Sequence, residues 1–231
     1  MATRSRPRAY LLLSRISNLP TVWTNVLAAH VITNAAFDSM PIALLSMSVF
    51  YTGGMFLNDA FDASFDAQVR PDRPIPNGDV SRREVFAIGF ALLLAGELLL
   101  AFVTCPVPAM LWGAALAVAI VFYDYRHKGQ WYGPVMMGAC RALIYCAAAA
   151  GAIGMVPAAA VIAALVMWPY IVALTIVART SGKGYLVPWL LAGICIIDAI
   201  IIASLGFPGW ALVAAAGFIL TLLFQRVVPG T

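Results

Sequence analysis

The chain has 231 residues, of which 63% are hydrophobic and only 10% are charged, with a formal net charge of +4 and a mean hydropathy of +0.92. Soluble globular domains contain far fewer apolar residues and about twice as many charged ones, so this composition excludes an ordinary water-soluble protein. It predicts an integral membrane protein.

The chain divides into apolar stretches of about 20 residues, the length a helix needs to cross a hydrocarbon core of roughly 30 Å. The stretches are continuously apolar, without the alternation of a membrane barrel, and therefore predict an all-α fold. Eight spans are expected, at about 18–36, 41–58, 84–103, 106–123, 134–153, 157–178, 185–204 and 207–225. We expect a single domain over residues 1–231, folded as a polytopic helical bundle.

The basic residues segregate to one side of these predicted spans. With a cytoplasmic N-terminus, that side receives Arg4, Arg6, Arg8, Arg15, Arg70, Arg73, Arg82, Arg83, Arg126, Lys128, Arg179, Lys183 and Arg226. The connections on the other side, near 37–40, 104–106, 154–157 and 205–208, contain no Lys or Arg. The asymmetry predicts a cytoplasmic N-terminus, and membrane topology with anionic lipid headgroups explains the positive charge without a nucleic-acid partner.

The second predicted span ends in the pattern N-D-x-x-D-x-x-x-D, formed by Asn58, Asp59, Asp62 and Asp66. On a helix the three aspartates are spaced i, i+3, i+7 and share one face. Burying carboxylates at a membrane border costs free energy unless a cation neutralises them. The pattern therefore predicts a site for a divalent cation.

The chain between this pattern and the third span contains Pro71, Pro74, Pro76 and Gly78, which cannot continue a helix. We expect a rigid loop that folds away from the carboxylate face. Ser81, followed three residues later by Glu84, is typical of a helix N-terminus and predicts the start of the third span.

Arg70 and Arg73 follow the acidic pattern closely. Magnesium is usually held by a few carboxylates together with phosphate oxygens of a substrate, and arginine binds the same phosphate through planar, often bidentate contacts. Acids and arginines together indicate a diphosphate site near the cytoplasmic surface. In the alternative interpretation, the acids and bases only pair with one another on a solvated loop.

The acidic pattern followed by R-P-D-R-P-I-P-N-G at 70–78 closely resembles the first aspartate-rich motif and loop of the UbiA superfamily of intramembrane prenyltransferases. The segment R-I-S-N-L-P-T-V-W-T-N-V at 15–26 is similar to that family's first helix. Y-D-Y-R-H-K at 123–128 and G-P-V-M-M-G-A-C-R at 133–141 are similar to its fourth-to-fifth helix region, and the latter is most similar to an EboC-like branch.

This resemblance implies a helical bundle around a central cavity. It also implies a magnesium-dependent transferase that moves an isoprenyl group from an isoprenyl diphosphate to an acceptor, which the sequence leaves unidentified. It implies that Asn58, Asp59, Asp62 and Asp66 hold Mg²⁺, with the three aspartates as the catalytic acids. It further implies that Arg70 and Arg73 contact the diphosphate.

The chain departs from the family after the sixth predicted span. Members normally carry a second aspartate-rich motif there, whereas T-I-V-A-R-T-S-G-K-G at 175–184 contains no acid. Arg179 and Lys183 are expected either to contact the diphosphate directly or to serve only as topological anchors. Eight spans are also one fewer than is usual in the family.

Four further residues are candidates for the site. Arg141 lies about two turns into the fifth span, where a charged side chain should face a cavity or a partner, and we expect it to face the diphosphate or the acceptor. Lys128 is a candidate phosphate contact or an interfacial anchor. Arg15 and Asn18 are candidates for the acceptor side, with helix capping and headgroup contact as the alternative.

Two other functions stay open at this point. The prenyl cation can cyclise inside the cavity, as in a terpene cyclase, in which case no acceptor is consumed. Loss of the second acidic motif is also compatible with a non-catalytic membrane protein that binds or transports an isoprenoid or its precursor.

Overall fold

The structure is a computed structural model that describes residues 4–126, 130–180, 184–228 and 230. The described residues form helices and connecting turns, without strands. The longer helices are α1 (Arg6–Ser14), α2 (Leu19–Thr33), α3 (Met40–Val69), α4 (Arg82–Leu99), α5 (Pro106–Arg126), α6 (Gly133–Ile153), α7 (Ala158–Thr180), α8 (Val187–Ser204) and α9 (Pro208–Gln225). Short 3-10 turns are η1 (Ile16–Asn18), η2 (Phe37–Ser39), η3 (Leu100–Phe102) and η4 (Gly184–Leu186).

Among the described residues, seven helices are long and apolar enough to cross a membrane, namely α3 to α9 with their adjoining turns. The remaining predicted span, 18–36, corresponds to α2, whose 15 residues reach about 22 Å at 1.5 Å per residue. The predicted bundle of about eight helices is confirmed, and the chain is an integral multi-pass membrane protein.

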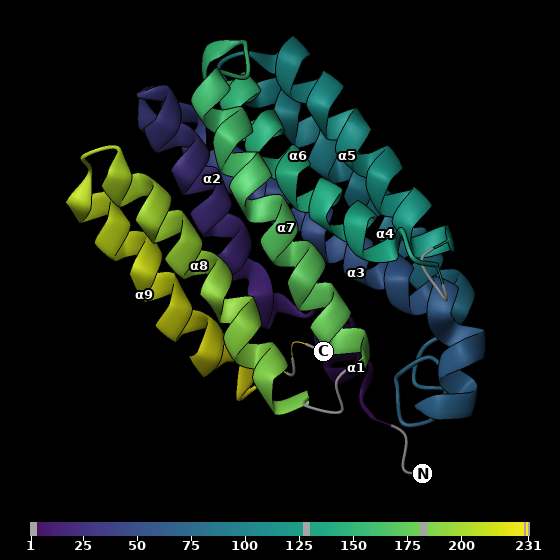
Figure 1. The fold of residues 1–231 in the computed structure, drawn as a ribbon. Coiled ribbons are helices and arrows are strands. Elements are labelled where there is room, and N and C mark those ends of the chain that lie inside the picture. The colour runs from purple at the N-terminus through teal and green to yellow at the C-terminus, as the bar shows by residue number, and fades with distance from the viewer. Residues whose placement is uncertain (1–3, 127–129, 181–183, 229, 231) are drawn as a thin grey trace.

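Helix α2 is the central element of the bundle. It packs against α3, α6, α8 and α9, and its residues from Pro20 to Val31 are buried apart from a half-buried Trp23. Successive helices pair as neighbours around it, α3 with α4, α5 with α6, α6 with α7 and α8 with α9 (Figure 1). A helix that is apolar around most of its circumference is expected in such an interior position.

Helices α3 and α4 approach closely through small residues. A Cβ atom added at Gly53 would lie 3.0 Å from the carbonyl oxygen of Gly89, and one at Gly96 would lie 2.8 Å from the Phe50 ring. Small residues allow this approach, which packs membrane helices in the absence of a strong hydrophobic drive between them.

Helix α3 extends well past its apolar part to Val69 (Figure 1). As predicted, it does not continue into the proline segment that follows. Helix α4 begins where the capping pattern placed it, since the Ser81 hydroxyl accepts a hydrogen bond from the Glu84 backbone N–H at 3.2 Å. The short helix α1 was not predicted. Its position is set by distant contacts, including those from the Arg6 and Tyr10 side chains to Glu84.

Candidate active site

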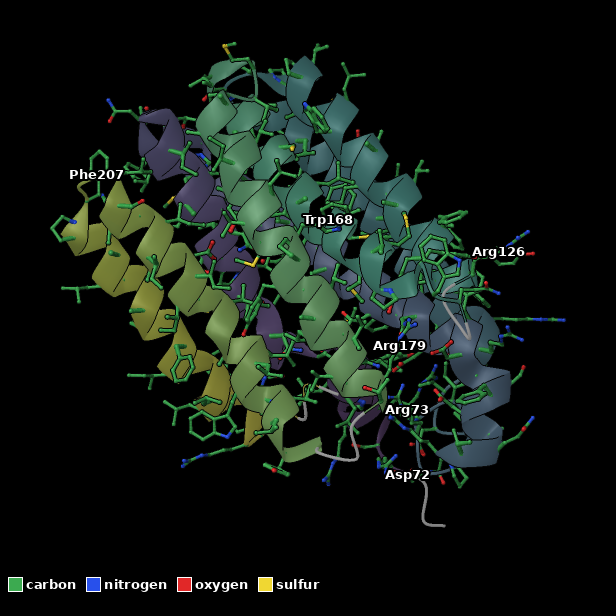
Figure 2. All side chains as sticks on the ribbon, in the orientation of Figure 1. Asp72, Arg73, Arg126, Trp168, Arg179 and Phe207 are labelled. Carbon is green, nitrogen blue, oxygen red and sulfur yellow. The ribbon has the colours of Figure 1, made fainter. Side chains whose placement is uncertain are left out.

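The acidic pattern lies on the last part of α3 and faces inward. Asn58, Asp59, Asp62 and Asp66 are all buried, with 5 to 9% of each residue exposed. The shared face predicted from the i, i+3, i+7 spacing is therefore present. Arg73, Arg126 and Arg179 lie toward this end of the bundle, whereas Phe207 lies at the opposite end (Figure 2).

Asp59 is held by two arginines. Its Oδ1 accepts hydrogen bonds from Arg15 Nη2 at 2.6 Å and from Arg73 Nη1 at 2.7 Å, and Arg73 Nη1 also lies 3.3 Å from Asp66 Oδ2. The loop that carries Arg73 thus folds back onto the carboxylates. The prediction that this loop turns away from them was wrong, because the charge attraction between buried carboxylates and arginine is not visible in the local proline pattern.

Arg15 reaches Asp59 through an unusual backbone conformation. It ends α1 and begins η1 with φ 44° and ψ 39°, in the left-handed region that side-chain-bearing residues rarely occupy. Such strain persists where surrounding contacts fix it, and here the ion pair to Asp59 does so. The kink directs the guanidinium toward α3.

Asn58 is oriented by α5. Its Nδ2 donates to Asp124 Oδ1 at 3.1 Å, and both residues are buried. Because the carboxylate can only accept, the amide nitrogen must face Asp124 and the amide oxygen points elsewhere. This contact connects the acidic face of α3 to the end of α5.

A cavity of about 820 Å³ opens beside the acidic face. Its charged lining comprises two aspartates and five arginines: Asp62, Asp66, Arg15, Arg70, Arg73, Arg141 and Arg179. Asn18, Tyr51, Asn58 and Tyr123 add polar groups, and α7 and α8 contribute mainly apolar side chains. Asp59 is not part of this lining and lies behind two of the arginines. The cavity therefore carries an excess of positive charge that favours an anion.

The α7 side of the cavity carries a basic residue, whereas the α3 side carries carboxylates. Arg179 lies in the last turn of α7, lines the cavity and donates from Nη1 to the Gln130 carbonyl oxygen at 3.4 Å. Within the described part of the 175–184 segment, Thr175 and Ala178 also line the cavity. Lys128 and Lys183, both predicted as phosphate contacts, lie outside the described residues.

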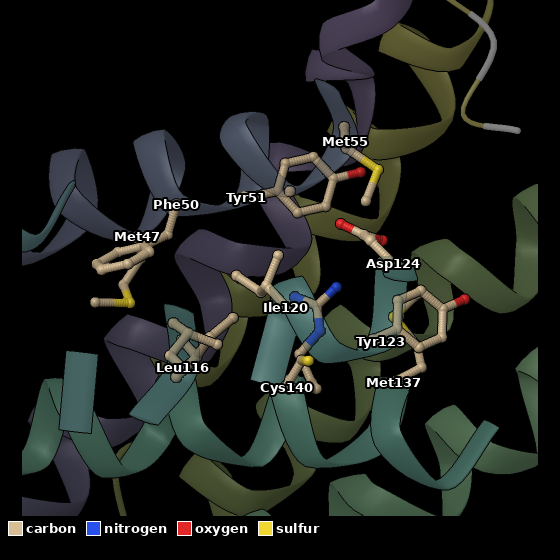
Figure 3. A pocket seen from close by; sticks show the side chains of 13 residues that line it. Met47, Phe50, Tyr51, Met55, Leu116, Ile120, Tyr123, Asp124, Met137 and Cys140 are labelled. Carbon is tan, nitrogen blue, oxygen red and sulfur yellow. The ribbon is translucent and has the colours of Figure 1, made fainter. Parts of the chain in front are cut away.

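A small apolar pocket of about 80 Å³ adjoins the cavity and shares five lining residues with it, Tyr51, Met55, Tyr123, Met137 and Arg141. Figure 3 shows Met47, Phe50 and Leu116 at one end of this pocket, and Tyr51, Asp124 and Tyr123 at the other. The first three are almost completely buried. A polar chamber thus continues into an apolar one between α3, α5 and α6.

Arg141 lies at the boundary of the two chambers, as expected of a charged residue inside a span. Its Nη1 donates to Asn25 Oδ1 at 2.9 Å, and its Nη2 donates to Thr21 Oγ1 at 3.2 Å. Sequence reasoning missed these two α2 residues. The available signal was their spacing with Asn18, because 18, 21 and 25 follow the same i, i+3, i+7 pattern as the acids.

Asn18, a candidate for the acceptor side, lines the cavity just before the start of α2. Its Nδ2 donates to Tyr51 Oη at 3.1 Å and to the Gly230 carbonyl oxygen at 3.0 Å, and its Oδ1 accepts from Gln225 Nε2 at 2.9 Å. These contacts fix the amide between α3 and the end of the chain.

Among the described residues, no group of three or more His, Cys, Asp or Glu side chains is close enough to hold a metal ion by itself. The carboxylate of Asp59 is engaged by Arg15 and Arg73, and Arg73 also lies 3.3 Å from Asp66. Asn58, Asp62 and Asp66 still present oxygen donors along the cavity wall, and oxygen is the donor type that magnesium prefers.

Comparison with known proteins identifies the same family as the sequence motifs. The sequence profile described as "UbiA prenyltransferase family" matches residues 17–228. Two relatives are digeranylgeranylglyceryl phosphate synthases, from Methanopyrus kandleri, 36% identical over 125 residues, and from Ignicoccus hospitalis, 35% identical over 99 residues. These matches cover 53% and 43% of this chain but only 45% and 33% of the relatives, so the chain matches less than half of each curated protein.

Two solved structures share the fold. One is of a digeranylgeranylglyceryl phosphate synthase in membranes, with a TM-score of 0.62, 16% identity and coverage of 96% of this chain and 98% of that one. The other is a UbiA homologue from Archaeoglobus fulgidus bound to GPP and Mg²⁺, with a TM-score of 0.62, 15% identity and coverage of 95% and 86%.

Proposed function

The chain belongs to the UbiA prenyltransferase family, and we propose that it is a magnesium-dependent transferase that moves an isoprenyl group from a prenyl diphosphate to an acceptor. The reaction takes place in the 820 Å³ cavity and the adjoining apolar pocket. The fold neighbour from Archaeoglobus fulgidus, which was solved with GPP and Mg²⁺, supports this choice of donor.

The observation that carries the proposal is the continuity of a basic cavity with an apolar pocket. Five arginines and two aspartates line the first, and Met47, Phe50 and Leu116 close the second. A prenyl diphosphate has the same division into a multiply charged head and an apolar tail. Arginine suits the head because its planar donors match phosphate oxygens.

Asn58, Asp62 and Asp66 are the residues that would hold magnesium. Their oxygen chemistry fits, and a set of two carboxylates and an amide is adequate because substrate phosphates usually complete the shell of this ion. Bound there, magnesium would neutralise charge on the diphosphate. Asp59 has a different role in this proposal, since it fixes Arg15 and Arg73 at the cavity wall.

The chain's own residues then act on the departing diphosphate. The bond between the first prenyl carbon and the diphosphate oxygen breaks, and its electron pair stays on that oxygen. Arg73, Arg141 and Arg179 donate hydrogen bonds to the growing negative charge and keep their protons. The acceptor atom bonds to the prenyl carbon, and the acceptor proton is released to water with the diphosphate. The apolar pocket excludes water from the prenyl group meanwhile.

For the acceptor we propose an alcohol with a glycerol phosphate headgroup. The name of the curated relatives, digeranylgeranylglyceryl phosphate synthase, supports this class. The charge balance of the cavity supports it as well, because five arginines against two aspartates can accommodate a second anion beside the diphosphate. Arg15 and Asn18 are proposed for this acceptor side.

We place the cavity near the cytoplasmic surface, with the N-terminus on the same side. The basic residues support this orientation, since the ends of α3, α5 and α7 that carry Arg70, Arg126 and Arg179 would all be cytoplasmic.

The test uses purified protein in lipid nanodiscs with labelled geranylgeranyl diphosphate, with and without geranylgeranylglyceryl phosphate as the acceptor. Mass spectrometry of products and measurement of released diphosphate are made in magnesium and in excess chelator. We expect a doubly prenylated glyceryl phosphate that requires both magnesium and the acceptor.

Other results would point elsewhere. Diphosphate release with a hydrocarbon product and no need for the acceptor would indicate a cyclase. The absence of diphosphate release with each prenyl diphosphate offered, under conditions where the protein is folded, would favour a binding or transport protein.

A further inference from the structure

Three fully buried polar residues meet in the interior of the bundle, on three different helices. Asn25 of α2, Tyr145 of α6 and Asp198 of α8 each have 0% of their surface exposed. A carboxylate in this position is expensive unless it is paired and hydrogen-bonded, and intramembrane ionisable residues are usually there for a function.

The three residues form one hydrogen-bonded network that ends on Arg141. Asn25 Nδ2 donates to Asp198 Oδ2 at 2.7 Å and lies 3.1 Å from Tyr145 Oη, while the Tyr145 hydroxyl donates to Asp198 Oδ1. On its other side, Asn25 Oδ1 accepts from Arg141 Nη1 at 2.9 Å.

Chemistry fixes the orientation of the Asn25 amide. A guanidinium can only donate and an ionised carboxylate can only accept, so the amide oxygen must face Arg141 and the amide nitrogen must face Asp198. A flipped amide would put like groups together on both sides. Asn25 thereby connects a buried negative charge to a positive one, and the side chain of Arg141 loses the freedom that a long arginine would otherwise have.

Arg141 is the member of the network that reaches open space. It is half-buried and lines both the basic cavity and the apolar pocket. Its hydrogen bonds to Asn25 and Thr21 engage two of the five guanidinium N–H groups. The boundary it occupies is the place where the head and the tail of a prenyl diphosphate would join.

We propose that Asn25 and Asp198 are positioning residues that hold Arg141 against the diphosphate oxygen that leaves the prenyl carbon. This inference rests on the proposed function. A donor fixed in advance stabilises the charge that develops on this oxygen without having to reorganise, and its effect is larger in the transition state than in the bound substrate. The site thus includes residues of α2 and α8 that lie behind Arg141 and act through it.

The experiment is a double-mutant cycle on purified protein in nanodiscs, with diphosphate release from geranylgeranyl diphosphate as the readout. Arg141→Met is expected to lower kcat about 100-fold, and Asn25→Leu about ten- to 100-fold, with KM within about threefold in both. The double variant should be no slower than Arg141→Met alone, because Asn25 acts through Arg141.

Asp198→Asn keeps the shape of the side chain and removes its charge, and we expect a loss in kcat of about tenfold. Ser46→Ala is the matched control. Ser46 is also fully buried and donates to the Gly96 carbonyl oxygen at 2.7 Å, but it lies outside both chambers. Its kcat should stay within about twofold of wild type, and thermal unfolding of every variant checks that the bundle is intact.

The outcomes separate the two proposals. Suppose that the wild type is active. If the losses of Asn25→Leu and Arg141→Met multiply in the double variant, or if Asn25→Leu loses activity only in proportion to its folded protein, the positioning role alone is overturned. A folded wild type that releases no diphosphate would overturn the proposed function, and this assignment with it.

Discussion

The ends of α3 and α7 lie on the same cavity but carry opposite charge. The α3 end presents Asn58, Asp62 and Asp66, whereas the described end of α7 presents Arg179 and no acid. A diphosphate therefore needs a cation to approach the carboxylates of α3, whereas it can bind Arg179 of α7 without one. The difference shows how a site can accept the same anion by two kinds of contact, one through a metal and one through arginine directly.

The two walls also differ in what holds their charges in place. On α3, Asp59 bonds Arg15 and Arg73, so arginines from before and after the helix are tied to it. On α7, Arg179 bonds neutral groups, the Gln130 backbone oxygen at 3.4 Å and the Tyr123 side chain. We infer that ion pairs fix the α3 wall more firmly than neutral hydrogen bonds fix Arg179. Four variants test this comparison.

The largest effect is expected from Asp62→Asn combined with Asp66→Asn. Removing both carboxylates removes the proposed metal contacts while keeping side-chain size, and diphosphate release should fall by about 10²- to 10³-fold. The measurement is turnover at saturating magnesium. Asp38→Asn, at an exposed acid in the turn η2 between α2 and α3, is the control and should retain full activity. Turnover of the double variant within threefold of wild type would show that the α3 wall does not hold the metal.

Asp59→Asn should act mainly on stability. The side chain is 7% exposed and compensates two guanidinium groups, so its neutralisation leaves buried positive charge and should lower the free energy of unfolding by about 2 to 3 kcal/mol. Reversible denaturant unfolding in micelles measures the change. Asp72→Asn, on the exposed part of the same loop, should change it by less than about 0.5 kcal/mol. Equal changes in the two variants would contradict the claim that the α3 wall is fixed by Asp59.

Arg179→Gln probes the α7 wall. If this guanidinium binds the diphosphate directly, its loss should raise KM for geranylgeranyl diphosphate about tenfold and change unfolding little. The control is Arg226→Gln, an exposed arginine at the end of α9 that does not line the cavity. An unchanged KM would contradict direct binding and favour the alternative stated in the sequence analysis, in which Arg179 is only a topological anchor.

The smallest effect is expected from Asp79→Asn in the loop after α3. Burial tends to raise the pKa of Asp79, but hydrogen bonds from the Arg4 backbone and side chain and from Asn77 outweigh it and hold the pKa below its usual 3.8. A lowered folded-state pKa stabilises the protein above pH 3.8, and this contribution is lost as the pH falls through the folded-state value. The variant should therefore be less stable than wild type by under about 1 kcal/mol at pH 6, with the gap closing below pH 3.8. A gap that is constant with pH would show that the carboxylate charge is not involved.

The site was partly predictable. The spacing of Asp59, Asp62 and Asp66 fixes their common face whatever the rest of the chain does, because a helix has one period. Arg70 and Arg73 were expected beside a diphosphate on the basis of their nearness in sequence, and both line the cavity. The return of the loop onto Asp59 was not predicted, since prolines specify where a helix stops and not where the next segment goes.

The residues behind Arg141 on α2 and α8 escaped sequence reasoning for a related reason. Arg141 and Asn25 are 116 residues apart, and Asn25 and Asp198 are 173 apart. Nothing in the surroundings of Asp198, an acid within an apolar helix, indicates which helix will supply its partner. Packing around α2 decides that.

The sequence by itself determined the membrane-spanning architecture, the start of α4 at Ser81 and the acidic face of α3, because these follow from hydropathy, capping and helical periodicity over a few turns. Tertiary structure alone decided that Asp59 binds two arginines, that a basic cavity continues into an apolar pocket, and that Arg141 is held at their boundary. Those features arise from contacts between helices far apart in the chain, and their geometry exists only once α2, α6 and α8 have packed together.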